Sequence, residues 1–175
     1  MAIADYADRV ATLSGSAVRE ILKLTQQPDM ISFGGGMPSE DAFPTEDLKR
    51  IMNGIVADLG GEVLQYGVTE GYLPLREEIV KMMAAKGVQT KADDVLITSG
   101  SQQGIDLVAR AFLNKGDKVI VESPTYLSAI QVFKLYEADL IPVAVDEDGI
   151  LPGELQKIFD TYGEAVKLVY MVPTF

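Results

Sequence analysis

The sequence predicts an α/β fold in which a mostly parallel sheet lies between layers of helices. From Asp94 onward, apolar strand-like runs alternate with helical runs. The four runs are VLIT (95–98), KVIVE (118–122), LIPVAV (140–145) and KLVYMV (167–172). They are nearly continuous in apolar residues, as strands buried on both faces are. This alternation predicts three layers, α/β/α, with right-handed crossovers.

The helices between these strands are expected near residues 101–113, 124–137 and 152–162. The second of them has Ser123 as its expected cap and Pro124 at the first helical position, where the missing N–H costs nothing. These helices provide the outer layers that cover the sheet.

Further helices precede the strands. Thr45 is a good N-cap for a helix that Gly60-Gly61 ends, and another helix follows Pro74. A short N-terminal helix is expected from Ser16 to the Gln26-Gln27-Pro28 segment. Apolar residues at helical spacing mark the first of these helices: Leu48, Ile51, Met52, Ile55, Val56 and Leu59.

The composition is that of a globular protein. Of the 175 residues, 47% are hydrophobic and 23% are charged, and none is cysteine or histidine, so thiol chemistry and the commonest general base and metal ligand are excluded. Because the net charge is −11 and the 15 basic residues are scattered, neither nucleic acid nor a membrane surface is expected as a partner. No apolar run approaches the roughly 20 residues that span a bilayer. We expect a cytoplasmic protein.

The segment TSGSQQG, Thr98 to Gly104, follows the first predicted strand. Gly100 permits a tight turn into the helix and Ser101 can cap it, so that backbone N–H groups and the Ser101 and Gln102 side chains converge. Such a turn can hold a phosphate, although a capped turn that binds nothing fits equally well. The segment is neither a Walker A loop nor a dinucleotide fingerprint.

Three tyrosines lie outside the predicted strands and helices or at their ends. Tyr126 lies near the end of the run KVIVE, where an aromatic ring can stack on a planar ligand or pack in the core. Tyr66 and Tyr72 lie in a loop between two helices, which by itself reads as an ordinary surface loop. The acidic pairs and triplets, such as residues 146–148, read as solvated turns.

The order of five segments along the chain is more specific than any one of these weak signals. The segments are ISFGGGMP (31–38), LQYGVTEGYLPLRE (64–77), VLITSGSQQGIDL (95–107), VESPTYLSAI (121–130) and LVYMVPTF (168–175). Taken together, they resemble class I/II aminotransferases of pyridoxal-phosphate (PLP) fold type I, over about residues 14–175. The likeness is nearest to the branch of 2-aminoadipate and kynurenine aminotransferases.

The resemblance implies cofactor-binding roles. Ser101 and Gln102, with their backbone amides, would hold the phosphate of pyridoxal 5′-phosphate. Tyr126 would stack on the pyridine ring. Tyr66 would reach the phosphate of the cofactor in the other subunit, so the family's active site needs a homodimer.

The resemblance also implies substrate contacts and a division of the chain. Gly36 would lie against bound substrate, and Arg19 matches a position near the substrate side chain. Residues 1–45 would form an N-terminal arm and substrate-side segment, and residues 46–175 the first half of the PLP-binding large domain. The full-length enzyme would move an amino group from an amino acid to a 2-oxo acid.

In the resembled family, the lysine that binds PLP covalently follows the VPTF position. No lysine of this sequence matches it, so no catalytic residue is assigned and the 175-residue chain alone is expected to be inactive. Three alternatives stay open. They are a non-catalytic α/β module that binds a phosphorylated ligand, an inert fragment, and a regulator with an aminotransferase-like half.

Overall fold

The computed structural model describes residue 5, residues 7–11, residue 36 and residues 38–173. The described residues form two compact units. One comprises residues 98–173 together with the short helix α1 (Asp8–Ala11), and the other comprises residue 36 and residues 38–97. The helix predicted from Ser16 lies outside the described residues.

A four-stranded sheet lies at the centre of the first unit. Its strand order is β3-β2-β1-β4, and β2 and β4 both run parallel to the central strand β1. The short edge strand β3 pairs with β2 in an antiparallel hairpin. The mostly parallel sheet that the apolar runs predict is therefore confirmed. The strand bounds are β1 Lys118–Ser123, β2 Asp139–Asp146, β3 Gly149–Ile150 and β4 Val166–Tyr170.

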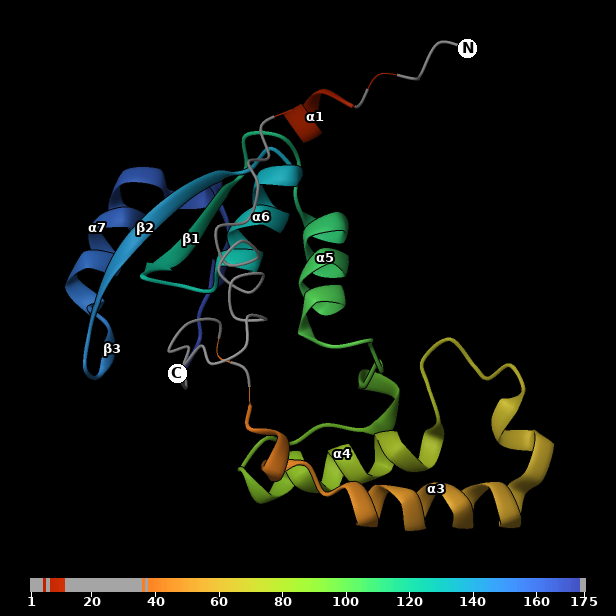
Figure 1. Cartoon of the computed structure of the whole chain (residues 1–175). Coiled ribbons are helices and arrows are strands. Elements are labelled where there is room, and N and C mark those ends of the chain that lie inside the picture. The colour runs from red at the N-terminus through yellow and green to blue at the C-terminus, as the bar shows by residue number, and fades with distance from the viewer. Residues whose placement is uncertain (1–4, 6, 12–35, 37, 174–175) are drawn as a thin grey trace, which may run out of the picture. The chain divides into compact units, whose positions relative to one another are not determined.

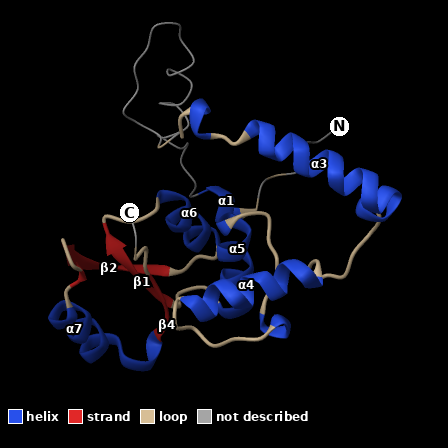
Figure 2. Cartoon of the chain, turned by 90° about the horizontal axis from the view of Figure 1, so that it is seen from below, coloured by secondary structure: helices blue, strands red, loops and turns tan. Residues whose placement is uncertain are grey.

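Helices cover both faces of this sheet, as the three-layer prediction requires. The helices α5 (Ser101–Phe112) and α6 (Leu127–Leu135) lie on one face, and α7 (Pro152–Tyr162) lies on the other (Figures 1 and 2). All three fall within or close to the ranges expected from the sequence. A short 3₁₀ helix, Gly163–Ala165, connects α7 to β4.

The main core lies between the sheet and the helix pair α5–α6. Val119 and Val121 of β1 point to this side, because alternate strand residues face the same layer. They pack with buried side chains of the two helices, and Phe133 of α6 meets Tyr170 of β4 edge-to-face, with ring centroids 5.7 Å apart. The other buried residues of this core come from the two helices and from the C-cap of α5; they are Ala109, Leu113, Ala129, Val132 and Phe133.

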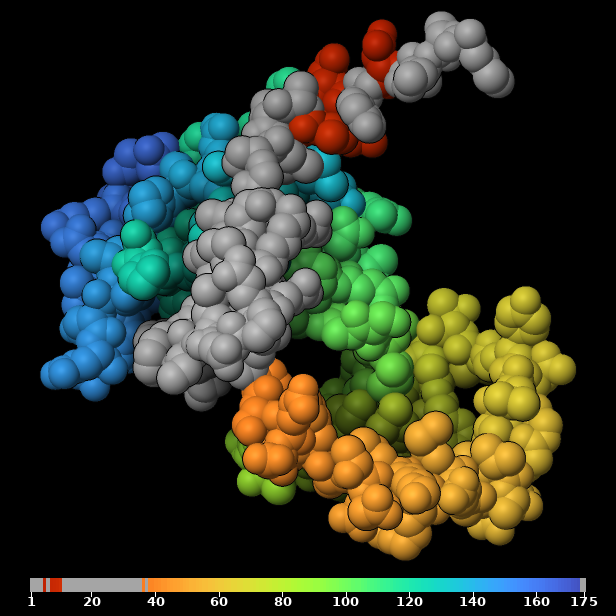
Figure 3. All heavy atoms as spheres, in the orientation of Figure 1, coloured from red at the N-terminus to blue at the C-terminus, as the bar shows by residue number. Residues whose placement is uncertain are grey.

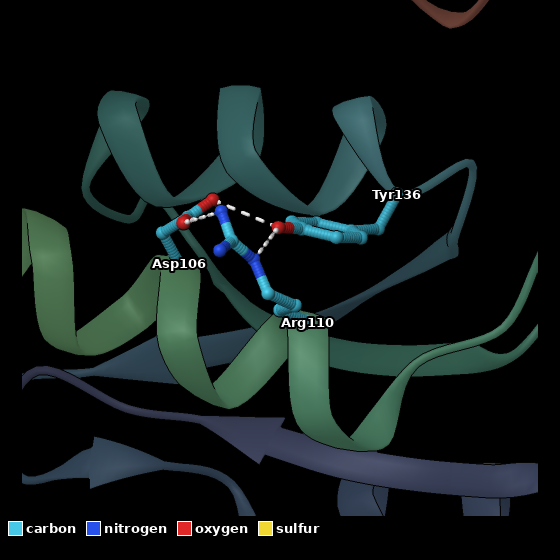
Figure 4. Close-up of polar contacts among 3 residues, drawn as sticks. All are labelled: Asp106, Arg110 and Tyr136. Atoms are coloured by element: carbon cyan, nitrogen blue, oxygen red, sulfur yellow. Dashed lines mark hydrogen bonds and ion pairs between the residues drawn. The ribbon is translucent and has the colours of Figure 1, made fainter.

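A polar cluster joins α5 to the residue that follows α6 (Figure 4). The Tyr136 hydroxyl donates to Asp106 Oδ1 at 3.0 Å and accepts a hydrogen bond from Arg110 Nε at 3.3 Å. Arg110 also pairs with Asp106 Oδ2 at 3.0 Å. Tyr136 and then Asp106 raise the pKa of the Arg110 guanidinium. The cluster fixes the two helices against each other at the edge of the core.

The second unit contains α3 (Thr45–Leu59) and α4 (Leu73–Ala85), with short 3₁₀ helices at Glu40–Ala42, Gly60–Leu64 and Ala92–Asp94. Arg76 of α4 is buried here, with 8% of its surface exposed. Its guanidinium donates to the carbonyl of Gly71 at 3.1 Å and to that of Ala92 at 3.0 Å. One side chain thereby ties α4 to the loop before it and to a segment after it.

One predicted strand, VLIT, is wrong. Residues 95–98 lie outside the sheet and form no ladder. A strand needs paired backbone groups along its length, whereas here Ile97 N–H donates to the carbonyl of Glu70, 2.9 Å away. Gly71 lies so close to the Ile97 side chain that a Cβ on Gly71 would clash.

Three predicted helix caps also differ from the structure. Pro44 is the N-cap of α3, and Thr45 is its first helical residue, because Leu48 N–H bonds to the carbonyl of Pro44. Gly100, not Ser101, caps α5. Ser123 does not cap α6, since it still pairs with Ala144 in the sheet.

In the part of the chain that the structure describes, no helix has the length and apolar character needed to cross a membrane.

Candidate functional site

The carboxyl ends of the parallel strands form the edge at which α/β sheets bind ligands. A cavity of about 480 Å³ opens there. Its walls come from the end of β1, the end of β2 and the segment that follows β4. The residues that line it are Glu122, Pro124, Thr125, Tyr126, Val145, Asp146 and Val172.

Tyr126, which the sequence predicts as a ring-binding residue, lies in the wall of this cavity. It is the N-cap of α6 and 44% of its surface is exposed, so it is not a core tyrosine. The helix begins at Leu127, not at Pro124 as predicted, because the chain leaves β1 only after Ser123. The segment Pro124–Tyr126 therefore forms a loop at the strand end and presents the Tyr126 ring to the cavity.

Thr125 provides an independent test of whether this cavity fits a polar ligand. Its Oγ1 is buried and has no hydrogen-bond partner in the described residues. A buried hydroxyl without a partner costs free energy. Rotation of the Thr125 side chain toward the cavity would let a polar group of a ligand supply the missing partner, and the aromatic ring of Tyr126 lies on the adjacent residue.

The turn into α5 has the form of an anion cradle. Gly100 has φ +79°, which favours glycine, and no side chain caps the helix. The first N–H groups of a helix have no partner within the helix, and they form the positive end of its dipole. Gln103 Oε1 accepts the Ser99 N–H at 2.5 Å and Thr98 Oγ1 donates to the carbonyl of Gly100 at 3.1 Å, so the turn is held from both sides.

Ser101 and Gln102 both lie in the first turn of α5, and both are exposed. Ser101 lines a second cavity of about 310 Å³ between α5, α6 and β4, whereas Tyr126 lines the first cavity. Tyr170 lies near both cavities. It lines the Ser101 cavity, and burial and then the nearby Tyr126 and Glu122 raise the pKa of its phenol.

The other predicted site residues lie elsewhere. Tyr66, in the second unit, has 99% of its surface exposed, and its backbone N–H bonds to the Gln65 side chain at 2.8 Å. Gly36 has φ +60°, and a Cβ there would meet no atom within 4 Å. Its conformation, not lack of space, therefore favours glycine. Arg19 lies outside the described residues.

Sequence reasoning missed Glu122. Its side chain is 4% exposed, lies in the cavity wall and accepts the backbone N–H of Val172 at 2.8 Å. The signal was present in the run KVIVE, since an acidic residue ends a strand that is otherwise buried. Its partner, 50 residues further on, has no sequence signal.

Comparison with known proteins assigns the chain to a family. Residues 28–171 match the model of aminotransferase class I and II. Aromatic-amino-acid aminotransferase 1 of Thermococcus litoralis is 37% identical over 97% of this chain and 42% of its own length. The chain thus spans about two fifths of that curated relative.

Two solved structures extend this comparison. Kynurenine aminotransferase of Pyrococcus horikoshii, solved in complex with PMP, is 40% identical with a TM-score of 0.87, over 97% of this chain and 43% of that one. The α-aminoadipate aminotransferase of Thermus thermophilus, complexed with N-(5′-phosphopyridoxyl)-L-leucine, is 34% identical with a TM-score of 0.80, over 96% of this chain and 40% of that one. The cavity at the strand ends, the cradle before α5 and these matches agree, and the chain belongs to the class I and II aminotransferases.

Proposed function

We propose that this chain supplies the phosphate-binding and ring-binding side of a PLP-dependent aminotransferase that moves an amino group from an amino acid to a 2-oxo acid. The observation that carries the proposal is the strand-end cavity with the exposed ring of Tyr126 in its wall, in a chain of this family. When bound, PLP supplies an electron sink for the negative charge that develops at the substrate α-carbon.

The residues near the strand ends suit the two halves of this cofactor. The N–H groups of Ser101 and Gln102 would bind the dianionic phosphate, with the α5 dipole in support. Tyr126 would contact the flat pyridine ring. The buried Thr125 hydroxyl is a further donor on the same wall.

Substrate contacts are proposed for Gly36 and Arg19, and both depend on family likeness alone. The amino donor would belong to the class named in the relatives: aromatic amino acids, kynurenine and 2-aminoadipate. A cytoplasmic location remains a prediction.

The experiment adds PLP to the purified chain, records its visible spectrum, reduces it with borohydride and maps any modified lysine by mass spectrometry. We expect a spectral change without a lysine adduct in the 175-residue chain. We also expect amino transfer from one of these donors by the protein that carries this chain. An unchanged PLP spectrum and no retained PLP would overturn the proposal. A single lysine adduct with turnover would contradict the expected inactivity of the chain alone.

We further propose that the active protein is a homodimer. Helix α3 lies at the surface of its unit (Figure 3), and one of its faces exposes a row of apolar side chains. A contiguous patch of exposed apolar side chains on a protein surface often marks an interface with another protein chain. Tyr66, fully exposed in the loop after α3, is then available to a site in the partner subunit. The exposed apolar residues of α3 are Leu48, Ile51, Met52, Ile55, Val56 and Leu59.

Sedimentation velocity tests the dimer. Ile55→Asp on the apolar face should shift the protein to monomer, because a carboxylate would be buried in the interface. Asn53→Asp on the same helix introduces the same charge and serves as the control, which should remain a dimer. A wild-type monomer at all concentrations would contradict the proposal.

A further inference from the structure

Glu122 is a charged side chain at a buried position of the central strand. Val119, Ile120 and Val121 precede it in β1 and are also buried. A carboxylate out of contact with water costs free energy unless hydrogen bonds compensate for the lost hydration. An apolar residue at this position would be buried at a lower cost in free energy. The buried carboxylate is therefore expected to have a role other than packing.

The contact of this carboxylate extends the sheet beyond its last backbone pair. The pairing of β1 with β4 ends at Val121 and Tyr170. Just past that end, Glu122 Oε2 accepts the N–H of Val172 at 2.8 Å. The side chain thus takes the place of a backbone carbonyl and holds the chain where it leaves β4. Hydrogen bonds to a carboxylate are stronger than those to a neutral acceptor.

The same two residues separate two cavities. Glu122 and Val172 line the cavity of about 480 Å³ that contains Tyr126, and they also line a neighbouring cavity of about 670 Å³. Met171 and Pro173 line only the second. The hydrogen bond between Glu122 and Val172 therefore lies in the wall between the two spaces and sets the shape of the one that faces Tyr126.

We propose that Glu122 is a positioning residue for the cofactor site: its carboxylate fixes the Val172 backbone and so fixes one part of the wall of the cavity that Tyr126 also lines. Glu122 itself makes no contact with the cofactor in this proposal. The inference rests on the proposed function, since it concerns the orientation of PLP in that cavity.

Three substitutions separate this role from simple packing. Glu122→Gln keeps an acceptor oxygen at the same distance. Glu122→Met keeps the length and volume but has no acceptor oxygen. Glu122→Asp keeps the charge, but its side chain is one methylene shorter, so the carboxylate no longer reaches the Val172 N–H. For each, PLP affinity is measured by equilibrium ultrafiltration, the visible circular dichroism of bound PLP reports the ring orientation, and hydrogen exchange reports protection of the Val172 amide.

We expect Gln to retain the wild-type dichroism band and Val172 protection. Met and Asp should lose both and weaken PLP binding about tenfold, which corresponds to about 1.4 kcal/mol. If Met does not fold, the comparison of Asp with Gln carries the test. The positioning role is overturned if the wild type binds PLP and all variants give the same band and affinity. A wild type that binds no PLP overturns the proposed function itself, which the wild-type measurement alone reveals.

Discussion

The Tyr136 hydroxyl donates a hydrogen bond to Asp106 across 30 residues of sequence, at 3.0 Å (Figure 4). Asp106 also accepts a hydrogen bond from Arg110, which lies one turn further along α5. The Asp106 carboxylate therefore has two donors, Tyr136 and Arg110. Tyr136 lies directly after α6 and is partly buried. The contact therefore connects the two helices that together cover one face of the sheet.

Tyr136→Phe should lower the free energy of unfolding by about 1 kcal/mol, the typical net value of one hydrogen bond. The ring stays in place, so its packing against the core is kept. Urea unfolding measures the change. Tyr72→Phe is the control because Tyr72 is 65% exposed, and it should change the free energy far less. Equal effects of the two substitutions would contradict a stabilising role for the Tyr136 hydroxyl.

Arg76→Met should destabilise the unit of residues 38–97 more strongly. The substitution keeps much of the buried side-chain volume but leaves the carbonyls of Gly71 and Ala92 without their donor. The expected loss in free energy of unfolding is about 2–3 kcal/mol, since buried groups left unpaired lose their full desolvation cost. Urea unfolding and limited proteolysis of the loop before α4 measure it.

Arg50→Met provides the matched control for Arg76. Arg50 pairs with Asp47 at 3.0 Å, but its side chain is 73% exposed. Exposed pairs of this kind contribute little to stability. A control as unstable as Arg76→Met would show that loss of any arginine, and not the buried contact, explains the effect.

The sheet and its helices were predictable because their signal is local. Apolar runs and helical spacing locate β1, β2 and β4 and the helices between them, and the structure has them within a few residues. The helix caps were not predictable in the same way, because a cap forms only where the backbone pairing of the preceding strand ends. Ser123 has the right chemistry for a cap, but it remains in the ladder opposite Ala144.

Contacts between distant residues explain the other misses. VLIT has the composition of a buried strand, yet the Ile97 amide bonds to a loop carbonyl and the segment joins no ladder. The hydrogen bond between Glu122 and Val172 connects residues 50 positions apart, which no periodicity reports. The position of Tyr126 near a strand end was predictable, because it follows from the order of elements alone.

Two glycines near the start of α5, one before the helix and one inside it, should respond in opposite directions to substitution by alanine. Gly100→Ala should lower the free energy of unfolding by about 1 kcal/mol, because an L-residue at φ +79° is strained even though a Cβ has room. Gly104→Ala should raise it by up to about 1 kcal/mol, because Gly104 is inside the helix and its Cβ would lie 3.9 Å from Thr98 Oγ1. Thermal and urea unfolding compare the pair. The same sign for both would contradict the conformational argument.

The phenol of Tyr170 should make the stability fall at alkaline pH. Burial, then Tyr126 and Glu122, raise its pKa above the usual 10.0. A raised folded-state pKa means that folding favours the neutral phenol. Its contribution is therefore fully present below the unfolded-state pKa and is lost as the pH rises through the folded-state pKa.

Tyr170→Phe tests this pH dependence. It keeps the ring that packs against Phe133 but cannot ionise. The difference in free energy of unfolding between wild type and variant is followed from about pH 9 to about pH 11. The wild type should lose stability relative to the variant across this range. A constant difference would mean that the phenol ionises equally in the folded and unfolded chain.

Tyr126 gives the most direct test of the cofactor site. Tyr126→Ala should weaken PLP binding by about 0.5–1.5 kcal/mol, the range typical of aromatic stacking. Tyr126→Phe keeps the ring and should bind PLP almost as the wild type does. Because Tyr126 is 44% exposed at the start of α6, neither substitution should greatly change the unfolding midpoint. Titration of PLP by visible absorption measures the affinities. Equal PLP affinity for Ala and wild type would exclude a stacking role, whereas equal loss in Ala and Phe would assign the contact to the hydroxyl.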